Sequence, residues 1–172
     1  MVFVLDPGVG RYVPDVLGSS EPPNQSLPYV IVRPIGYDGA IDSAYFLEVI
    51  LDVPPGLGAE FSFCVTEHDA NGDERRFWRS RDLANVIPRG ARPSIVTELG
   101  WLCFAIAMIA KPPEFSMFTF EADLPDKALK KYKIMCGQFE SAGYNITSEE
   151  YHGRKIWRMV RQNSAPDLEM PK

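Results

Sequence analysis

Apolar residues run almost without interruption over positions 95–110, IVTELGWLCFAIAMIA. A helix built from this stretch is apolar on every side, so the rest of the protein has to cover it on every side. Pro93 suits the first turn of such a helix, and Lys111 before two prolines suits its end. We therefore predict a core helix that the other elements enclose.

The uncharged part of this helix is too short to span a bilayer. Twelve residues lie between Glu98 and Lys111, and at about 1.5 Å per residue they reach roughly 18 Å, against roughly 30 Å of hydrocarbon. The first residues also lack the pattern of a secretion signal. The sequence thus predicts a cytoplasmic protein that does not associate with a membrane.

Alternating apolar and polar residues predict two neighbouring strands, at 45–53 and 59–67. If Leu51 pairs with Phe61, the alternate residues of both strands lie on the same face. A slip of one residue would turn one of the two sets to solvent. We therefore expect this register.

The next strand, near residues 75–79, is expected to return through an Asn71-Gly72 turn. This dipeptide is a strong signal for a hairpin loop of two residues. The resulting register places Trp78 beside Val65 on the buried face. Phe77 would then point to the opposite, outer face of the sheet.

Similar patterns predict the other strands. A strand at 29–35 should lie at a sheet edge or end early, because Pro34 cannot donate a ladder hydrogen bond. Another strand is expected at 115–121. A closing hairpin is expected to pair 144–151 with 154–161.

A second helix is predicted from Asp126 to Ala142, and it is amphipathic. Its apolar residues form one stripe that packs on the sheet, and Gly143 is placed to end it. Four lysines are expected mainly outside the stripe: Lys127, Lys130, Lys131 and Lys133.

These elements fit a single α+β domain over residues 29–161. We expect an antiparallel-rich sheet of about six or seven strands with two helices packed on one face. Residues 1–28 contain five prolines, which predicts an irregular N-terminal arm. Residues 162–172 are expected to form a disordered tail.

Charge is distributed unevenly along the chain. The net charge is −5, of which residues 1–69 contribute −8 and residues 70–172 contribute +3. Such polarity can steer a charged partner. The three cysteines form no Cys/His cluster, which argues against a disulfide framework and structural zinc. We predict no metal and no cofactor.

The outer face of the predicted sheet mixes apolar and charged side chains, which favours a surface for binding another protein. The N-terminal arm is the alternative cover for this face. Glu48, Cys64 and Arg79 would lie side by side on it. The candidate binding residues, which include two arginines of the closing hairpin, are Phe46, Ile50, Phe77, Arg79, Arg154 and Arg158.

Four residues are weak candidates for catalysis. A cysteine beside an arginine can be a reactive thiolate, and carboxylates or a histidine can transfer protons. A surface pair, helix capping and a hairpin turn explain the same residues without catalysis. The four candidates are Cys64, Glu121, Asp123 and His152.

Basic and aromatic residues interleave at 74–81 and 154–161, as single-stranded nucleic acid would require. Strand alternation, however, is expected to turn Trp78 and Trp157 inward. The sequence therefore favours a non-enzymatic protein that binds another protein, of an immunity, inhibitor or accessory type. A small transferase or hydrolase, with its site near the two carboxylates and the closing hairpin, is the second hypothesis. Single-stranded nucleic-acid binding is the third.

Overall fold

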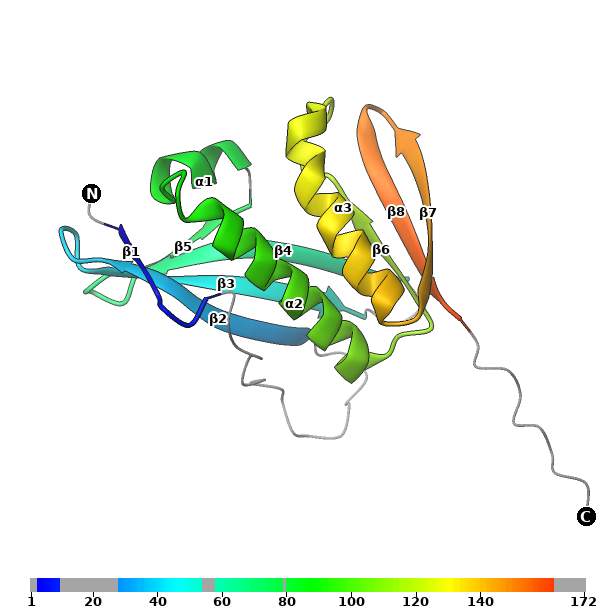
Figure 1. Cartoon of the computed structure of the whole chain (residues 1–172), viewed down its shortest axis with the longest axis horizontal. Coiled ribbons are helices and arrows are strands. Elements are labelled where there is room, and N and C mark those ends of the chain that lie inside the picture. Colours follow the sequence, from blue (N-terminus) through cyan, green and yellow to red (C-terminus); the bar gives the residue numbers. More distant parts are fainter. Residues whose placement is uncertain (1–2, 10–27, 54–57, 79, 163–172) are drawn as a thin grey trace, which may run out of the picture.

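A computed structural model of the chain contains one mixed sheet with a layer of helices on one face (Figure 1). The structure describes residues 3–9, 28–53, 58–78 and 80–162, and at 80, 81 and 84 the backbone alone. Arg79, the predicted tail beyond residue 162 and most of the predicted arm lie outside the described residues.

The described residues contain eight strands and three helices. The strands are β1 (Phe3–Leu5), β2 (Tyr29–Asp38), β3 (Ser43–Asp52), β4 (Ala59–His68), β5 (Glu74–Phe77), β6 (Glu114–Phe118), β7 (Tyr144–Tyr151) and β8 (Arg154–Arg161). The helices are α1 (Ser80–Val86), α2 (Arg92–Ala110) and α3 (Asp126–Ser141). The strand order is β1-β2-β3-β4-β6-β8-β7, with β5 also paired to β4. This confirms the predicted α+β fold, in which two long helices cover an antiparallel-rich sheet.

The register of β3 and β4 is the predicted one. Leu51 pairs with Phe61, and Leu47 pairs with Val65. All four side chains are buried in one core with the inner sides of α2 and α3. The Phe61 ring, for example, packs edge-on against Phe139 of α3 at 5.1 Å between ring centres.

The hairpin of β4 and β5 differs from the prediction by one residue. Val65 pairs with Phe77, not with Trp78. The loop has three residues instead of two and ends at Gly72, whose φ is +84°. A glycine in the left-handed region is the usual end of a three-residue hairpin loop. Because side chains alternate, the shift turns Phe77 to the core face and leaves Trp78 beyond the strand.

The closing hairpin of β7 and β8 has the predicted bounds and register. Glu150 pairs with Lys155, for instance. The two loop residues, His152 and Gly153, have φ angles of 49° and 71°. Two consecutive positive φ angles characterise the tight turn whose twist matches that of the strands.

Strand β2 continues to Asp38, past residue 35, where the predicted strand ended. A bulge between Pro34 and Gly36 lets β2 resume its pairing with β3. The short β1, which lies in the predicted irregular arm, then pairs with Gly36–Asp38. Gly36 permits this pairing because a Cβ there would overlap the Phe3 ring. Sequence analysis missed both β1 and α1.

Helix α2 packs on β2 and β3 and ends at Lys111, as predicted. The prediction that it is enclosed on every side is wrong. Leu102 and Ile106 are buried against the sheet, but Trp101 is 48% exposed and Met108 is 43% exposed. The fold has two layers, so it covers one side of α2. Within the described part of the chain, no further layer lies over the other side.

An ion pair links α2 to the sheet. Nε of Arg33 on β2 lies 3.1 Å from Oε1 of Glu98, whose side chain has no exposed surface. By length and composition, α2 is the one described helix that would be able to span a membrane, although 44% of its apolar window is buried within the protein. Its contacts with the sheet are those of a core helix.

Helix α3 has nearly the predicted bounds and ends before Gly143, whose φ is +90°. Tyr132 and Phe139 of its apolar stripe are buried. Lys131, which was expected outside the stripe, instead turns towards the sheet. Its Nζ lies 5.0 Å from the centre of the Phe63 ring on β4.

Candidate functional site

The outer sheet face contains part of the predicted binding surface. Phe46 and Ile50 of β3 are half-buried on this face, away from α2 and α3. Phe77 is not on it, because it packs against the core. Arg76 pairs with Thr66, the place predicted for Phe77, and its guanidinium reaches Glu48 from there.

Cys64 lies in the middle of this face, in surroundings that disfavour a thiolate. Its Sγ lies 3.8 Å from Oε2 of Glu48, and Nη2 of Arg76 lies 3.9 Å from the same oxygen. Burial and then the Glu48 carboxylate raise the pKa of Cys64 to about 11, against smaller effects of Thr66 and Arg76. The thiol therefore stays protonated at neutral pH, whereas a nucleophile has to ionise.

Two arginines of the closing hairpin, Arg154 and Arg158, are exposed. Arg154 is the first residue of β8, and Nε of Arg158 lies 3.3 Å from the Glu114 carboxylate of β6. Trp157 faces the core and stacks on Tyr132 with 4.9 Å between ring centres. Trp157 is therefore not available to stack on a nucleic-acid base, as this segment was expected to require for single-stranded nucleic acid.

Two weak catalytic candidates meet at the tip of the closing hairpin. The Asp123 N–H donates to the Gly153 carbonyl at 2.7 Å, and its carboxylate packs over the same glycine. His152 precedes Gly153, and its ring lies 4.2 Å from that of Tyr151. The structure thus brings Asp123 to the hairpin, as the enzyme hypothesis expects. Glu121, three residues after the end of β6, is the carboxylate whose charge acts on Lys131.

A cleft opens where the sheet divides. β4 pairs with the parallel strand β6 over Ala59–Phe61 alone, and with β5 over Val65–His68. Between these two pairings, no described strand lies along this edge of β4. Strand twist and a parallel pairing of three residues let β6, β8 and β7 turn away from β5. The opening is a cavity of about 220 Å³, which we call the sheet cleft.

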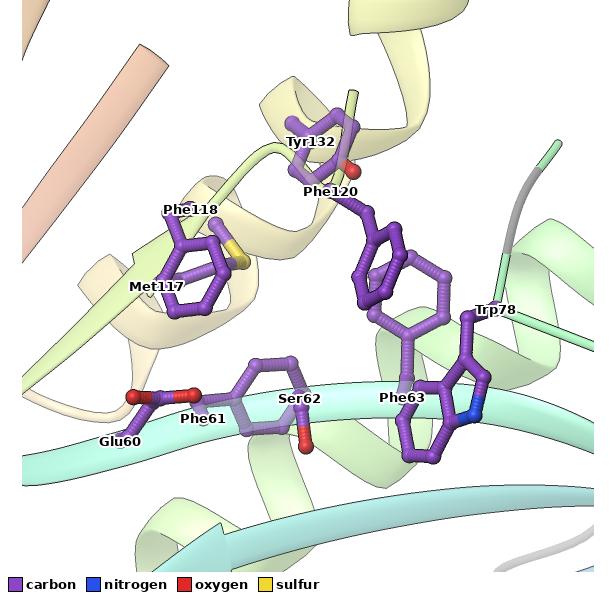
Figure 2. Close-up of a pocket in the computed structure, with 9 residues that line it drawn as sticks. All are labelled: Glu60, Phe61, Ser62, Phe63, Trp78, Met117, Phe118, Phe120 and Tyr132. Atoms are coloured by element: carbon purple, nitrogen blue, oxygen red, sulfur yellow. The ribbon is translucent and has the colours of Figure 1, made fainter. Parts of the chain in front are cut away.

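The sheet cleft is lined mainly by aromatic rings (Figure 2). Trp78 follows the end of β5 and Phe120 follows the end of β6. Their ring planes are 13° apart and their ring centres 6.4 Å apart. The complete lining is Glu60, Phe61, Ser62, Phe63, Trp78, Met117, Phe118, Phe120 and Tyr132.

Lys131 of α3 places its ammonium over two of the aromatic rings that line the cleft. Its Nζ lies 5.0 Å from the Phe63 ring centre and 5.2 Å from that of Tyr132. The faces of aromatic rings attract cations, but this attraction only partly compensates for the hydration that the ammonium loses on burial. Burial lowers the pKa of Lys131 to about 8, although Glu121 acts in the opposite direction. Burial also raises the pKa of Tyr132, to about 12.

A second exposed surface lies on the outside of the helical layer. Trp101 and Met108 are two turns apart on α2, and Ile109 follows. Ile134 of α3, 43% exposed, lies against Gly100, where an added Cβ would be 3.3 Å from its Cγ2. We call Trp101, Met108, Ile109 and Ile134 the helical patch.

Sequence analysis missed the cleft and its lysine. Phe120 was expected inside a strand that ends at residue 121, whereas β6 ends at Phe118. Trp78 was misplaced because its position depends on the length of the hairpin loop. One signal was available for Lys131, which lies four residues before Met135 and hence at the border of the apolar stripe.

Comparisons of the chain with protein-family models, with curated proteins and with solved structures gave no match.

Proposed function

We propose that this protein is a non-enzymatic binding protein that recognises another protein through the helical patch. One observation carries the proposal: large apolar side chains are exposed on the outside of a helix whose other side is buried in the core. Exposed apolar patches of this kind mark interaction surfaces, and tryptophan is among the residues that most often anchor them.

The positive charges of the helical layer favour a partner whose surface is acidic around the edge of the interface. Lys127, Lys130 and Lys133 are exposed on α3, the helix that contributes Ile134. Opposite charges at an interface rim increase the rate of association. The partner would therefore combine an apolar centre with an acidic rim.

The candidate catalytic groups give the enzyme hypothesis less support. Cys64 is buried beside a carboxylate with its pKa raised. Asp123 holds the closing hairpin through its backbone and packs on a glycine. Both arrangements are explained by the stability of the fold.

The test compares partners captured from cells of the source organism by three forms of the protein. The variant Trp101→Glu/Ile134→Glu places charge in the helical patch. The matched control Ile41→Glu/Val160→Glu changes residues that are 50% and 42% exposed elsewhere. We expect the control to retain a partner that the patch variant loses, with both variants folded by circular dichroism.

The proposal fails if the patch variant captures the same partners as the unmodified protein. A third variant, Phe46→Glu, examines the outer sheet face. Loss of a partner in this variant alone would move the interface to that face. Phe77→Glu does not serve this purpose, because Phe77 packs against the core.

A further inference from the structure

We propose that the free edge of β7 binds an extended segment of another protein, which adds an antiparallel strand to the sheet and places an acidic side chain beside Lys155. Helix α3 lines this site with a different side from the one that carries Ile134 of the helical patch. The proposal therefore does not depend on the function proposed above, and its test uses synthetic peptides instead of captured proteins.

Strand β7 is the last strand of the sheet and pairs with β8 alone among the described strands (Figure 1). At the opposite end of the sheet, β1 has three residues, whereas β7 has eight. The pairing of β7 with β8 contains no bulge, and β7 contains no proline. Shortness, bulges, prolines and charges are the features that keep an edge strand from pairing with another chain. Of these, β7 has only Glu149 and Glu150 near the hairpin tip, so residues 144–148 are open to a further strand.

The backbone groups on the free edge belong to every second residue of β7. The Thr119 N–H donates to the Lys155 carbonyl at 2.9 Å, and the Lys155 N–H donates to Oγ1 of Thr119 at 3.1 Å. Lys155 of β8 thus directs both backbone groups away from β7. In an antiparallel ladder, its partner Glu150 then directs its own groups away from β8. By alternation, the residues whose N–H and C=O groups face the free edge are Tyr144, Ile146, Ser148 and Glu150.

A groove of about 330 Å³ lies between α3 and the closing hairpin, beside this edge. Ile146 and Ser148 line it from β7, and Gly137 lines it from α3. A Cβ added to Gly137 would have nothing within 4 Å, so the groove is open there. Side chains of an added strand that lie opposite Ile146 and Ser148 would share their face and enter the groove.

The lysines of the groove favour an acidic side chain opposite Ser148. Ser148 pairs with Trp157, and Nζ of Lys155 lies 5.7 Å from the centre of the Trp157 ring. The Lys155 ammonium therefore lies over the row that Ser148 and Trp157 form. Lys133 also lines the groove. Within the described part of the chain, neither lysine forms an ion pair. A carboxylate above Ser148 would meet two positive charges.

Two acidic residues restrict the register of the added strand. Glu140 lies two turns beyond Lys133 on α3, towards the start of β7. Glu150 follows Ser148 on the same face of β7, towards the hairpin tip. Both repel a carboxylate, so it is favoured only between them. Opposite Ile146, which packs against the core, an aliphatic side chain fits. The partner segment therefore carries an aliphatic residue two positions from an acidic one.

The test measures fluorescence anisotropy of a labelled peptide, Thr-Val-Thr-Glu-Thr-Val-Thr, with blocked termini. When its glutamate lies opposite Ser148, a valine lies opposite Ile146. We expect this peptide to bind, and the same peptide with glutamine in place of glutamate to bind about 3- to 10-fold more weakly. Equal affinities would overturn the role of Lys155. No binding of the glutamate peptide at millimolar concentration would overturn the site.

Methylation of peptide nitrogens tests the addition of a strand. In an antiparallel strand, the glutamate and the valines direct their N–H groups to β7, and the threonines between them direct theirs away. A peptide methylated at the glutamate and valines should not bind, whereas one methylated at the two inner threonines should bind. Equal binding of both would overturn strand addition, and the reverse result would overturn the antiparallel direction.

Variants of the protein locate the contact. Ser148→Pro removes an N–H from the free edge and leaves the bonds to β8, so binding should weaken at least about 10-fold. Its matched control, Ser148→Ala, keeps the N–H and should bind the peptide. Lys155→Met should weaken binding about 3- to 10-fold, whereas Arg89→Met removes a positive charge from an exposed position outside the groove and should not. Equal losses in these two variants would show that net charge attracts the peptide. Circular dichroism confirms that each variant is folded.

Hydrogen exchange followed by NMR gives a readout at single residues. At a peptide concentration ten times the Kd, exchange at Ile146 and Ser148 should slow about 10-fold. Thr147, whose N–H faces β8, should change little. Slowing at Thr147 equal to that at its two neighbours would contradict the proposed edge pairing.

Sedimentation velocity of the protein alone tests whether a second copy occupies the edge instead. We expect a monomer that binds the peptide. A dimer that Ser148→Pro dissociates, together with no binding of the peptide, would show that β7 joins two copies of this chain. That result would overturn the proposal.

Discussion

Replacing Glu98 by alanine should destabilise the protein more than any surface substitution. The Glu98 side chain has no exposed surface, and its carboxylate lies 3.1 Å from Nε of Arg33, which is itself 16% exposed. Removing one partner of a buried ion pair costs about 3–5 kcal/mol, because the remaining charge is left in a poorly solvated place. Water reaches part of Arg33, so we expect the lower end, about 3 kcal/mol.

The assay is urea unfolding at neutral pH, followed by circular dichroism, for Glu98→Ala and for a double-mutant cycle. The single variants are Glu98→Leu and Arg33→Met, and the double variant combines them. Leucine and methionine fill similar volumes, so the double variant should lie within about 1 kcal/mol of the unmodified protein. A coupling energy of about 2 kcal/mol or more would follow.

Two results would refute this reasoning. If Glu98→Ala costs less than about 1 kcal/mol, the pair does not anchor α2 to β2. If the double variant loses as much as the two single variants together, the side chains act independently. A change in the slope of the urea transition would instead indicate an altered unfolded or native state.

Three further predictions concern other parts of the fold. Gly153→Ala should lower the free energy of unfolding in urea by about 1–2 kcal/mol, since φ is +71° and the new Cβ would lie 2.6 Å from Oδ1 of Asp123. The control Gly137→Ala lies in α3, where an added Cβ has nothing within 4 Å. It should instead stabilise the protein by up to about 1 kcal/mol. Cys64, with its pKa raised to about 11, should hold about 100-fold less thiolate at pH 8 than a free thiol, so peptide mapping should show slow iodoacetamide labelling; labelling as fast as in the unfolded chain would contradict this. The pKa of Lys131 in the folded protein lies below its unfolded value of 10.5. The unfolded chain therefore binds more protons than the folded protein between about pH 8 and pH 10.5. Burial of this lysine lowers the stability of the fold below that range and no longer does so above it. The stability difference between Lys131→Met and the unmodified protein should therefore be largest near pH 7 and shrink as pH rises; a constant difference would contradict this.

Local sequence patterns predicted the strand register correctly where the side chains could be buried on only one face of the sheet. The pairing of Leu51 with Phe61 follows from alternation, because a slip would expose a whole row of apolar side chains. The closing hairpin follows from His152-Gly153, two residues that accept positive φ. In the β4–β5 hairpin, apolar and polar residues alternate only weakly along β5, so the length of the loop decided the register. Gly72 is compatible with a loop of two residues and with a loop of three. The sequence therefore predicted the wrong register and placed Phe77 on the wrong face.

The sequence by itself determined the α+β class, the bounds of α3, the C-terminal end of α2 and most of the strand pairing, because these depend on periodicity over a few residues. Only the tertiary structure decided which surfaces remain exposed. The apolar residues of α2 indicate that burial of this helix is favourable, but they do not indicate how many layers of the fold are available to bury it. With one sheet beneath it, α2 buries Leu102 and Ile106 and exposes Trp101. The sheet cleft likewise exists because β4 and β6 pair over three residues and then diverge, and contacts between such distant segments leave no periodic signal in the chain.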